Sequence, residues 1–298
     1  MTEKTEMDQP TFSWRASLRV YLQPVSLRMF LLGFAAGLPL LLVLGTLSFR
    51  LREAGIDRST IGYLSWVGLA YGVKWIWAPL VDRMPIPWLT RQLGRRRSWL
   101  LLSQIVIAGG LVGMALNDPS KLLGPLVAFA LAVAIASATQ DIALDAYRIE
   151  SAEVNAQAAL AASYQTGYRL AMIWAGAGVL WIAAWAQGEQ TTGYAQSAWQ
   201  AGYLAMALSM LPGMLVVLGS PEPVPLPFKP ARNVAEWLKG AVLEPFADFW
   251  LRYRWQALLL LALIAVYRIS DVVMGIMANP FYVDMGFTKS EVAGVTKG

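Results

Sequence analysis

A short loop crowded with arginine, lying between two long apolar segments, constrains this chain more than any other feature. The loop, residues 78–99, contains Arg83, Arg91, Arg95, Arg96 and Arg97. The flanking segments, 59–80 and 98–116, each approach the ~20 apolar residues that a helix needs to cross a bilayer. Short arginine-rich loops between such helices stay on the cytoplasmic side of the membrane. The chain is therefore predicted to be a polytopic membrane protein, oriented by this loop.

Composition supports a membrane protein and narrows the possible chemistry. Of the 298 residues 57% are hydrophobic and 14% charged, against about 25% charged in soluble domains. The net charge of +5 lies mainly in loops predicted to be cytoplasmic, so it indicates topology and not a nucleic-acid partner. The chain has no cysteine and no histidine, which excludes disulfides, thiolate or imidazole metal sites and histidine proton relays. We expect no metal and no cofactor, and carboxylates to carry any proton chemistry.

The apolar segments predict an all-α helix bundle with seven spans. They lie near residues 29–49, 59–80, 98–116, 122–141, 158–186, 198–218 and 255–277. The expected organisation is a cytoplasmic tail (1–28), a six-helix bundle (29–218), a cytoplasmic linker with an amphipathic helix (219–254), and a truncated start of a second bundle (255–298). The tail and the loops after even-numbered spans hold 15 lysines and arginines, against 4 in the loops after odd-numbered spans. Both ends of the six-helix unit are therefore predicted to be cytoplasmic.

The first span and the loop after it carry local signals. Gly33 and Gly37 form a small-xxx-small pair that lets a second helix approach closely, and we favour packing over ligand contact for them. Pro39 removes one backbone hydrogen bond and is expected to bend the helix. Arg50, Arg52 and Arg58 are expected in the outer loop that follows.

A weak repeat suggests how the whole chain is built. Residues 55–62 read G-I-D-R-S-T-I-G, and residues 286–293, 231 positions later, read G-F-T-K-S-E-V-A. Both follow an apolar span that contains proline. Parallel six-helix repeats joined by a linker are the layout of major facilitators. The second repeat stops at 298, where an eighth span should open, so we expect a chain cut short.

Two levels of family resemblance can be stated. Asp82, Arg83, Gly94, Arg95, Arg96 and Arg97 resemble the signature between spans two and three of major facilitators. More specifically, the chain resembles the AmpG muropeptide permease family through G-F-A-A-G-L-P, I-G-Y-L-S-W-V-G-L-A-Y-G-V-K-W-I-W-A-P-L-V-D-R, G-R-R-R-S-W-L-L, S-A-T-Q-D-I-A-L-D-A-Y, G-Y-R-L-A-M and V-Y-R-I-S-D, in that order. Tyr147-Arg148 departs from an expected aromatic-lysine pair, and most of a second half is missing.

The resemblance implies a transporter and not an enzyme. It implies proton-driven import of anhydromuramyl-peptides across the bacterial inner membrane for peptidoglycan recycling, a route linked to β-lactamase induction. The implied partners are an anionic muropeptide, protons and the lipid bilayer. The six residues of the signature are assigned to gating, because opposite charges at the inner edge of the membrane can latch helices in one conformation without touching the ligand.

Charged residues inside spans argue for function independently, since each costs at least ~2.5–3.5 kcal/mol on insertion scales. The candidates for binding an anionic substrate are Lys74, Arg169, Gln140 and Arg268. The alternative is that these cations serve the structure, with Arg268 paired to Asp271 three residues on, and Lys74 and Arg169 neutralising Asp141, Asp145 or Asp271.

The candidates for proton coupling are Asp141, Asp145 and Asp271. Asp141 and Asp145 share a helix face, and crowded carboxylates favour uptake of a proton. A cytoplasmic charge network with the loop arginines is an equal alternative. A D-x-x-x-D site for magnesium and diphosphate is disfavoured, because no second such motif exists, and the G-x-G-D pattern of a membrane protease is absent. A transporter for another anionic solute and an inserted half-bundle that transports nothing remain as further alternatives.

Overall fold

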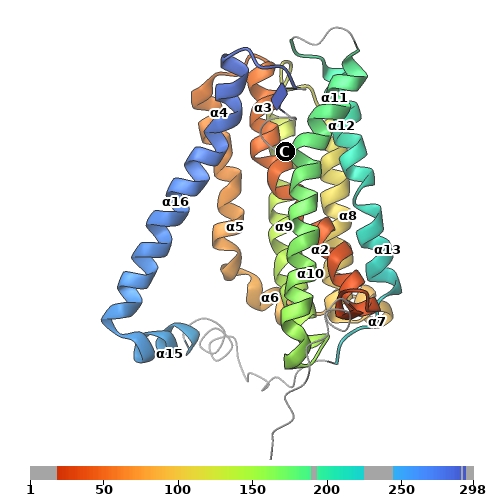
Figure 1. Cartoon of the computed structure of the whole chain (residues 1–298), viewed down its shortest axis with the longest axis vertical. Coiled ribbons are helices and arrows are strands. Elements are labelled where there is room, and N and C mark those ends of the chain that lie inside the picture. The colour runs from red at the N-terminus through yellow and green to blue at the C-terminus, as the bar shows by residue number, and fades with distance from the viewer. Residues whose placement is uncertain (1–18, 189–192, 225–243, 290, 293–298) are drawn as a thin grey trace, which may run out of the picture.

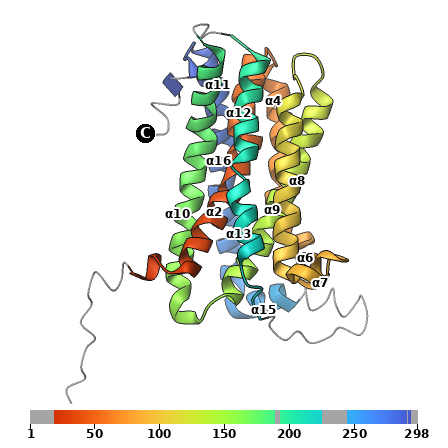
Figure 2. The same ribbon diagram turned by 90° about the vertical axis from the view of Figure 1, so that its right-hand side faces the viewer.

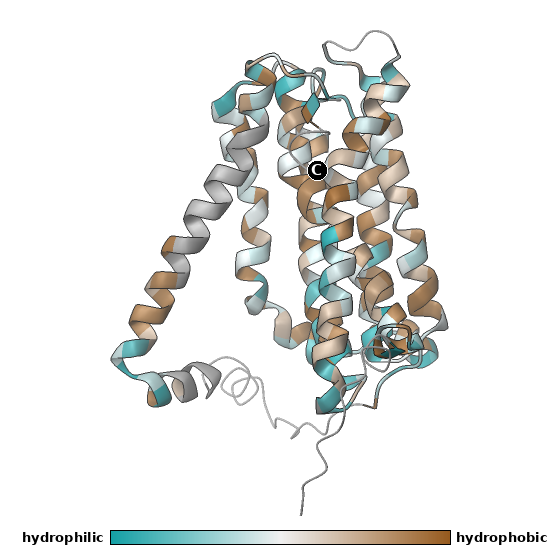
Figure 3. Cartoon of the chain, in the orientation of Figure 1, coloured by the Kyte–Doolittle hydropathy of each residue, from teal (hydrophilic) through white to brown (hydrophobic). Residues whose placement is uncertain are grey.

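The computed structural model describes residues 19–188, 193–224, 244–289 and 291–292. Within these ranges the chain is helical and contains no strand. Five of its helical stretches are long and apolar enough to cross a membrane. Hydrophobic residues dominate the middle of these stretches, and hydrophilic residues gather at the two ends of the bundle (Figure 3). The prediction of an all-α polytopic membrane bundle is confirmed.

The five stretches coincide with five of the predicted spans (Figure 1). The first consists of α2 (Pro24–Val43) and α3 (Gly45–Glu53), and the next two are α8 (Arg95–Leu116) and α9 (Leu123–Glu150). The fourth consists of α10 (Gln157–Ile173) and α11 (Val179–Gln187), with a π-helical turn between them. The fifth consists of α12 (Gln196–Leu208) and α13 (Leu211–Gly219). The helical spans can be read from the sequence because continuous apolar length is a local property.

The predicted second span is broken into short pieces and is not one of the five. It consists of α4 (Arg58–Leu64), α5 (Leu69–Val73) and α6 (Ala78–Arg83), joined by 3₁₀ turns at Ser65–Gly68 and Lys74–Ile76. Gly68 and Gly72 weaken a helix, and Pro79 cannot donate a backbone hydrogen bond. The short helix α7 (Leu89–Leu93) follows in the arginine-rich loop. Lys74 therefore lies where the helix is interrupted.

The last long helix, α16 (Trp255–Asp284), follows α15 (Glu244–Tyr253). It stands away from the bundle over most of its length and meets α3 and α4 near its C-terminal end (Figures 1 and 2). The predicted tail up to residue 18, most of the predicted amphipathic helix (up to 243) and the opening of an eighth helix (from 293) lie outside the described residues.

Glycine allows α2 and α10 to pack backbone against backbone. A Cβ atom on Gly33 would lie 2.2 Å from the Tyr164 carbonyl oxygen, and one on Gly37 would lie 2.4 Å from the Tyr168 carbonyl oxygen. From the other side, a Cβ on Gly167 would lie 2.0 Å from the Phe30 carbonyl oxygen. Real Cβ atoms essentially never approach another heavy atom below 3.0 Å. The predicted packing role of the Gly33 and Gly37 pair is confirmed.

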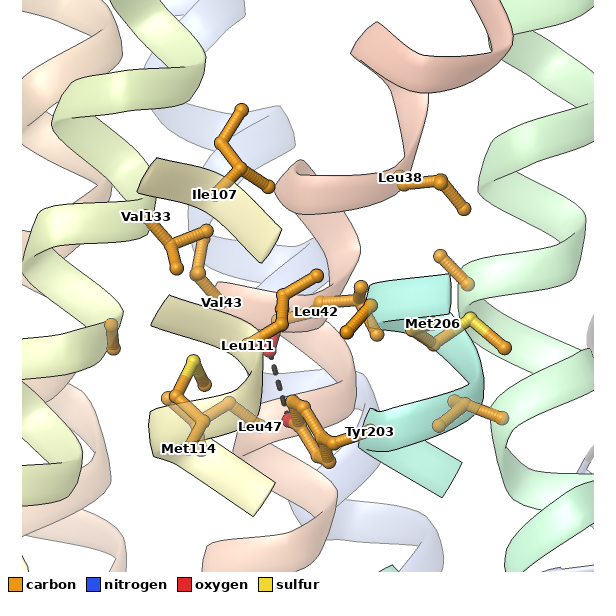
Figure 4. Packing of buried hydrophobic residues seen from close by; sticks show 14 of the residues in the cluster. Leu38, Leu42, Val43, Leu47, Ile107, Leu111, Met114, Val133, Tyr203 and Met206 are labelled. Carbon is orange, nitrogen blue, oxygen red and sulfur yellow. Dashed lines mark hydrogen bonds between the residues drawn. The ribbon is translucent and has the colours of Figure 1, made fainter. Parts of the chain in front are cut away.

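The core of the bundle lies between α2, α3, α8, α9 and α12 (Figure 4). The first span is interrupted at Leu44, just over one turn beyond Pro39, as expected from a proline in that helix. The Tyr203 hydroxyl donates to the carbonyl of Leu42 at 2.9 Å beside this interruption. The packed apolar side chains and this hydrogen bond together fix the bend in the first span.

The expectation that Arg50 and Arg52 lie in a loop is wrong, because both belong to α3. Arg50 is fully buried, and its guanidinium donates to the carbonyls of Met114 (2.7 Å) and Asn117 (2.6 Å) at the end of α8. It also lies 5.2 Å from the ring centre of Tyr203. The last carbonyls of a helix lack intrahelical donors and carry partial negative charge, so they attract a cation. That tertiary contact keeps this arginine inside the bundle.

Candidate functional site

The predicted gating residues come together around Arg96, whose side chain is only 3% exposed. One guanidinium nitrogen donates to Asp82 at 2.7 Å. Two others donate to the two oxygens of Glu150, at 3.0 and 2.6 Å, and that glutamate is also 3% exposed. The arginine therefore ties the end of α6 and the end of α9 to the beginning of α8. Two carboxylates facing one buried guanidinium are the arrangement that a buried charge requires.

Glu222, just beyond α13, binds the first turn of α8. Its two carboxylate oxygens accept the backbone N–H groups of Arg96 (2.7 Å) and Arg97 (3.1 Å). Gly94 permits this contact, since it has φ +88° and a Cβ there would lie 2.3 Å from the Glu222 carboxyl carbon. In return the Arg97 guanidinium donates to the Val217 carbonyl at 2.7 Å, near the end of α13. A carboxylate at a helix N-terminus and a cation at a C-terminus both suit the helix dipoles.

Arg83 and Arg95, the other two members of the predicted gating set, end α6 and begin α8 respectively. Glu150 and Glu222 belong to this network, and sequence reasoning did not select them. An arginine-rich cluster beside buried helix ends needs acidic partners. That requirement is the sequence signal that could have pointed to these two glutamates.

Lys74 and Asp141, predicted for substrate binding and proton coupling, form an ion pair within the bundle. The Lys74 ammonium lies 3.2 Å from Asp141 Oδ2, with the two side chains 34% and 15% exposed. The interruption after α5 places the lysine against α9, and Trp77 reinforces the contact by donating to the Thr139 hydroxyl at 3.1 Å. The second oxygen, Asp141 Oδ1, is buried and has no hydrogen-bond partner. The pair is thus made through a single contact.

Gln140, predicted for substrate binding, is fully buried next to this pair in the chain. Neither atom of its side-chain amide has a hydrogen-bond partner in the described part of the chain. Gln104 on α8 is in the same condition. Most buried polar groups in proteins are hydrogen-bonded, so each of these two amides is an unusual polar group in the core.

The other predicted residues do not join the Lys74–Asp141 pair. Asp145 is 56% exposed, and its nearest cation is Arg148 at 3.8 Å on the same helix. Arg169 lies exposed on α10, and no carboxylate among the described residues is within ion-pair distance of it. Arg268 and Asp271 belong to α16, but their side chains lie outside the described residues, so their expected pairing stays a prediction.

The described residues contain no group of three or more histidines, cysteines, aspartates or glutamates that could hold a metal ion. Within the D-x-x-x-D segment, Asp141 faces Lys74 and Asp145 faces Arg148. The two carboxylates therefore face separate cations.

A second charged cluster lies at the opposite end of the bundle from Arg96, and sequence reasoning missed it. Asp284 accepts from Arg52 at 2.5 Å and from Arg58 at 2.6 Å. Lys289 pairs with Glu53 at 2.9 Å. The signal that could have revealed these contacts is the repeat itself, because the charged residues flank its two copies at equal offsets.

Comparison with known proteins agrees with a transporter. A family profile described as acetyl-coenzyme A transporter 1 matches residues 26–118. The chain is 36% identical over 284 residues to the anhydromuropeptide permease of Escherichia coli K12, covering 94% of this chain and 53% of that protein. It is 34% identical over 269 residues to the putative transporter AmpG 4 of Rickettsia felis, covering 90% and 62%.

The chain thus spans about half the length of the permease and somewhat more of the Rickettsia protein. The match runs along nearly the whole of this chain, and the fold is the multi-pass helical bundle that a permease requires. The chain is therefore similar, along nearly its whole length, to membrane transporters named as AmpG permeases.

Proposed function

We propose that the chain is part of a proton-coupled importer of anhydromuramyl-peptides in the bacterial inner membrane, with its N-terminus in the cytoplasm. The name of the 36% identical permease supports the substrate class, and the excess of cationic residues in the loops after even-numbered spans supports the orientation. The observation that carries the mechanism is the ion pair between Lys74 and Asp141, which is made through one contact.

In this mechanism the pair exchanges partners. While Asp141 is ionised it holds the Lys74 ammonium, so the lysine is not available to a substrate. A proton taken up by Asp141 removes the negative charge, and the partly buried Lys74 is then left without its counter-charge, which is unfavourable. A carboxylate of the peptide stem replaces the lost counter-charge. Proton uptake and substrate binding are coupled in this way because both change the partner of one lysine.

Arg169 provides a second cation for the same substrate. It is exposed on α10 and has no carboxylate within ion-pair distance in the described residues. A guanidinium offers a planar fork of donors matched to a carboxylate, whereas an ammonium is a compact charge. Together the two cations suit a solute that carries several carboxylates. Asp145 and Gln140 remain proposed members of the site, as do Arg268 and Asp271 on α16.

The Arg96 network is proposed to act in gating and not in substrate binding. Its contacts join the ends of three helices, α6, α8 and α9, at one end of the bundle. Such contacts favour the conformation in which those helix ends meet. They can therefore shift the balance between conformations without touching the ligand.

Uptake of radiolabelled anhydromuropeptide into membrane vesicles containing the chain tests the proposal. Uptake should rise under an imposed inward proton gradient. Asp141→Asn, which removes the ionisable group, should abolish the response to the gradient, and Lys74→Gln should lower apparent affinity for the peptide. Asp118→Asn, in the loop between α8 and α9, is the control and should behave as wild type.

Two results would contradict the mechanism: wild-type uptake that ignores the gradient, or an Asp141→Asn variant that keeps the full response. If a folded, inserted chain takes up no peptide at all, the chain is not a transporter in itself and the alternative of a non-transporting half-bundle holds.

A further inference from the structure

The two copies of the sequence repeat fold in the same way. Gly55 follows α3 with φ +85°, and Gly286 follows α16 with φ +84°. In both copies the glycine N–H donates to the carbonyl three residues back at 3.0 Å, and the next N–H donates to the carbonyl five residues back, at 3.0 and 3.1 Å. This is the Schellman pattern of a helix end, for which glycine is favoured because it adopts a left-handed backbone without strain.

The similarity continues beyond the glycine. Two residues after it, Asp57 and Thr288 each begin the next helical turn: the aspartate accepts the Thr60 N–H at 2.9 Å, and the threonine shares a reciprocal cap with Glu291. From the glycine to the first residue of the next helical turn, the two copies therefore share the same backbone hydrogen bonds.

Charged residues flank both glycines at identical offsets. Two residues before the glycine stands an acid, Glu53 in one copy and Asp284 in the other. Three residues after it stands a base, Arg58 in one copy and Lys289 in the other. Each acid pairs with the base of the opposite copy: Arg58 Nε lies 2.6 Å from Asp284, and Lys289 Nζ lies 2.9 Å from Glu53. Contacts in which each partner repeats the other's role are the mark of a two-fold interface.

The two ion pairs differ in burial. Lys289 is 2% exposed and Glu53 10%, and the pair is enclosed by Trp199, which donates to Glu53 at 2.7 Å and whose ring centre lies 5.6 Å from the ammonium. Lys289 also donates to Gln187 at 2.5 Å. Asp284 is 15% exposed and Arg58 62%, so the second pair lies closer to the surface. The buried pair inserts a residue of the second repeat into the end of the six-helix bundle.

These contacts lie where α16 meets the rest of the molecule. The helix packs on α3 and α4 near its C-terminal end and stands apart from the bundle elsewhere (Figures 1 and 2). Because the two pairs are related by the repeat, any motion that separates the two repeats at this end breaks both pairs together.

We propose that the reciprocal pairs Glu53–Lys289 and Arg58–Asp284 form a latch between the two repeats that holds this end of the molecule closed. The proposal extends the transport function proposed above, in which this end faces away from the cytoplasm. The latch favours closed states there, and opening requires Lys289 and Glu53 to be rehydrated separately. The two reciprocal pairs together form a pseudo-two-fold contact between the repeats.

Distances between nitroxide spin labels test the latch without any transport measurement. The chain lacks cysteine, so labels can be placed at Asp118→Cys, in the loop between α8 and α9, and at Phe287→Cys, an exposed residue of the second repeat. Wild type should give a single short distance population. Glu53→Lys should raise the ratio of separated to closed molecules at least about tenfold, because it places two cations together in a buried site.

Charge exchange then identifies the pair itself. Lys289→Glu alone should separate the repeats as Glu53→Lys does, and the double variant should recover most of the closed population. Glu53→Gln, a milder change, should shift the ratio in the same direction by less. Lys121→Glu, an exposed charge in the loop between α8 and α9, should have no effect.

The latch is refuted if Glu53→Lys leaves the distance distribution unchanged, or if the double variant is no more closed than the single ones. These distances do not depend on uptake. A chain that fails to transport muropeptide but shows the charge-exchange pattern would keep the latch and lose the proposed function, and the reverse result would do the opposite.

Discussion

Replacing Gly33 by alanine tests the packing on which the bundle depends. The added Cβ would lie 2.2 Å from the Tyr164 carbonyl oxygen and 2.9 Å from its carbonyl carbon. These are backbone atoms of α10, so no side-chain rotation relieves the contact, and the helices have to separate until the distance exceeds 3.0 Å. Overpacking of this kind costs about 1–3 kcal/mol. The gain of up to ~1 kcal/mol from placing alanine in a helix offsets only part of it.

Two other glycines provide graded controls on one helix, α8. A Cβ on Gly110 would lie 2.4 Å from a side-chain atom of Val133 and not from backbone, and a Cβ on Gly109 would meet nothing within 4 Å. We expect Gly109→Ala to be neutral or to stabilise by up to ~1 kcal/mol. Gly110→Ala should fall between it and Gly33→Ala.

Reversible unfolding of the purified protein in mixed micelles by increasing SDS, followed by circular dichroism, measures the free energy of unfolding for each variant. If Gly33→Ala is as stable as Gly109→Ala, the close approach of α2 and α10 described here is incorrect.

Three further predictions use other parts of the structure. Arg96→Ala should lower the free energy of unfolding by about 3–5 kcal/mol in the same assay, because it removes both charge-assisted hydrogen bonds of the buried Glu150; a loss under 1 kcal/mol would contradict that role. With an impermeant thiol reagent on intact cells, Ser120→Cys should be labelled and Ser151→Cys should not, and the reverse would overturn the proposed orientation. The Ser59 and Thr60 hydrogen bonds hold the pKa of the Asp57 carboxyl below its usual range, so its stabilising effect is present above the unfolded pKa of ~3.9 and is lost as pH falls below it. The stability difference between wild type and Asp57→Ala should therefore shrink in acid, whereas a constant difference would contradict this linkage.

The membrane spans could be predicted because apolar length along the chain is a local quantity. The break in the second span is different, since residues 59–80 still form one long, largely apolar segment. Gly68, Gly72 and Pro79 carried the signal, and their combined effect places Lys74 at an interruption. The pairing of that lysine with Asp141 was one of two alternatives in the sequence, because distance between helices decides it and no local pattern reports that distance.

Arg50 shows why some site residues could not be predicted. A charged residue at the end of an apolar run resembles the start of a loop, and the sequence contains nothing to contradict that reading. Its burial depends on the carbonyls of Met114 and Asn117 at the end of another helix. In contrast, the Glu53–Lys289 pair was accessible in principle, since its two members occupy offsets that the repeat defines. The flanking charges of the two copies, and not the repeat alone, identify this pair.

The number of partners that each buried charge has separates structural from mobile charges in this protein. At one end of the bundle Arg96 is held by Asp82 and by both oxygens of Glu150. At the other end Lys289 is held by Glu53, Gln187 and the ring of Trp199. A charge with several partners cannot leave one of them without straining the others, so its contacts are made or broken together.

Between these two ends the situation is reversed. Lys74 and Asp141 share one contact at 3.2 Å, and Asp141 Oδ1 has no hydrogen-bond partner. A charge with one partner can exchange it for another of the same sign with little change in its own desolvation. The proposed coupling of a proton to an anionic solute requires an exchange of partners of this kind. Transport also requires the two ends of the bundle to open and close as units. In the proposed mechanism the two ends therefore control conformation, and the pair between them carries the charge transfer.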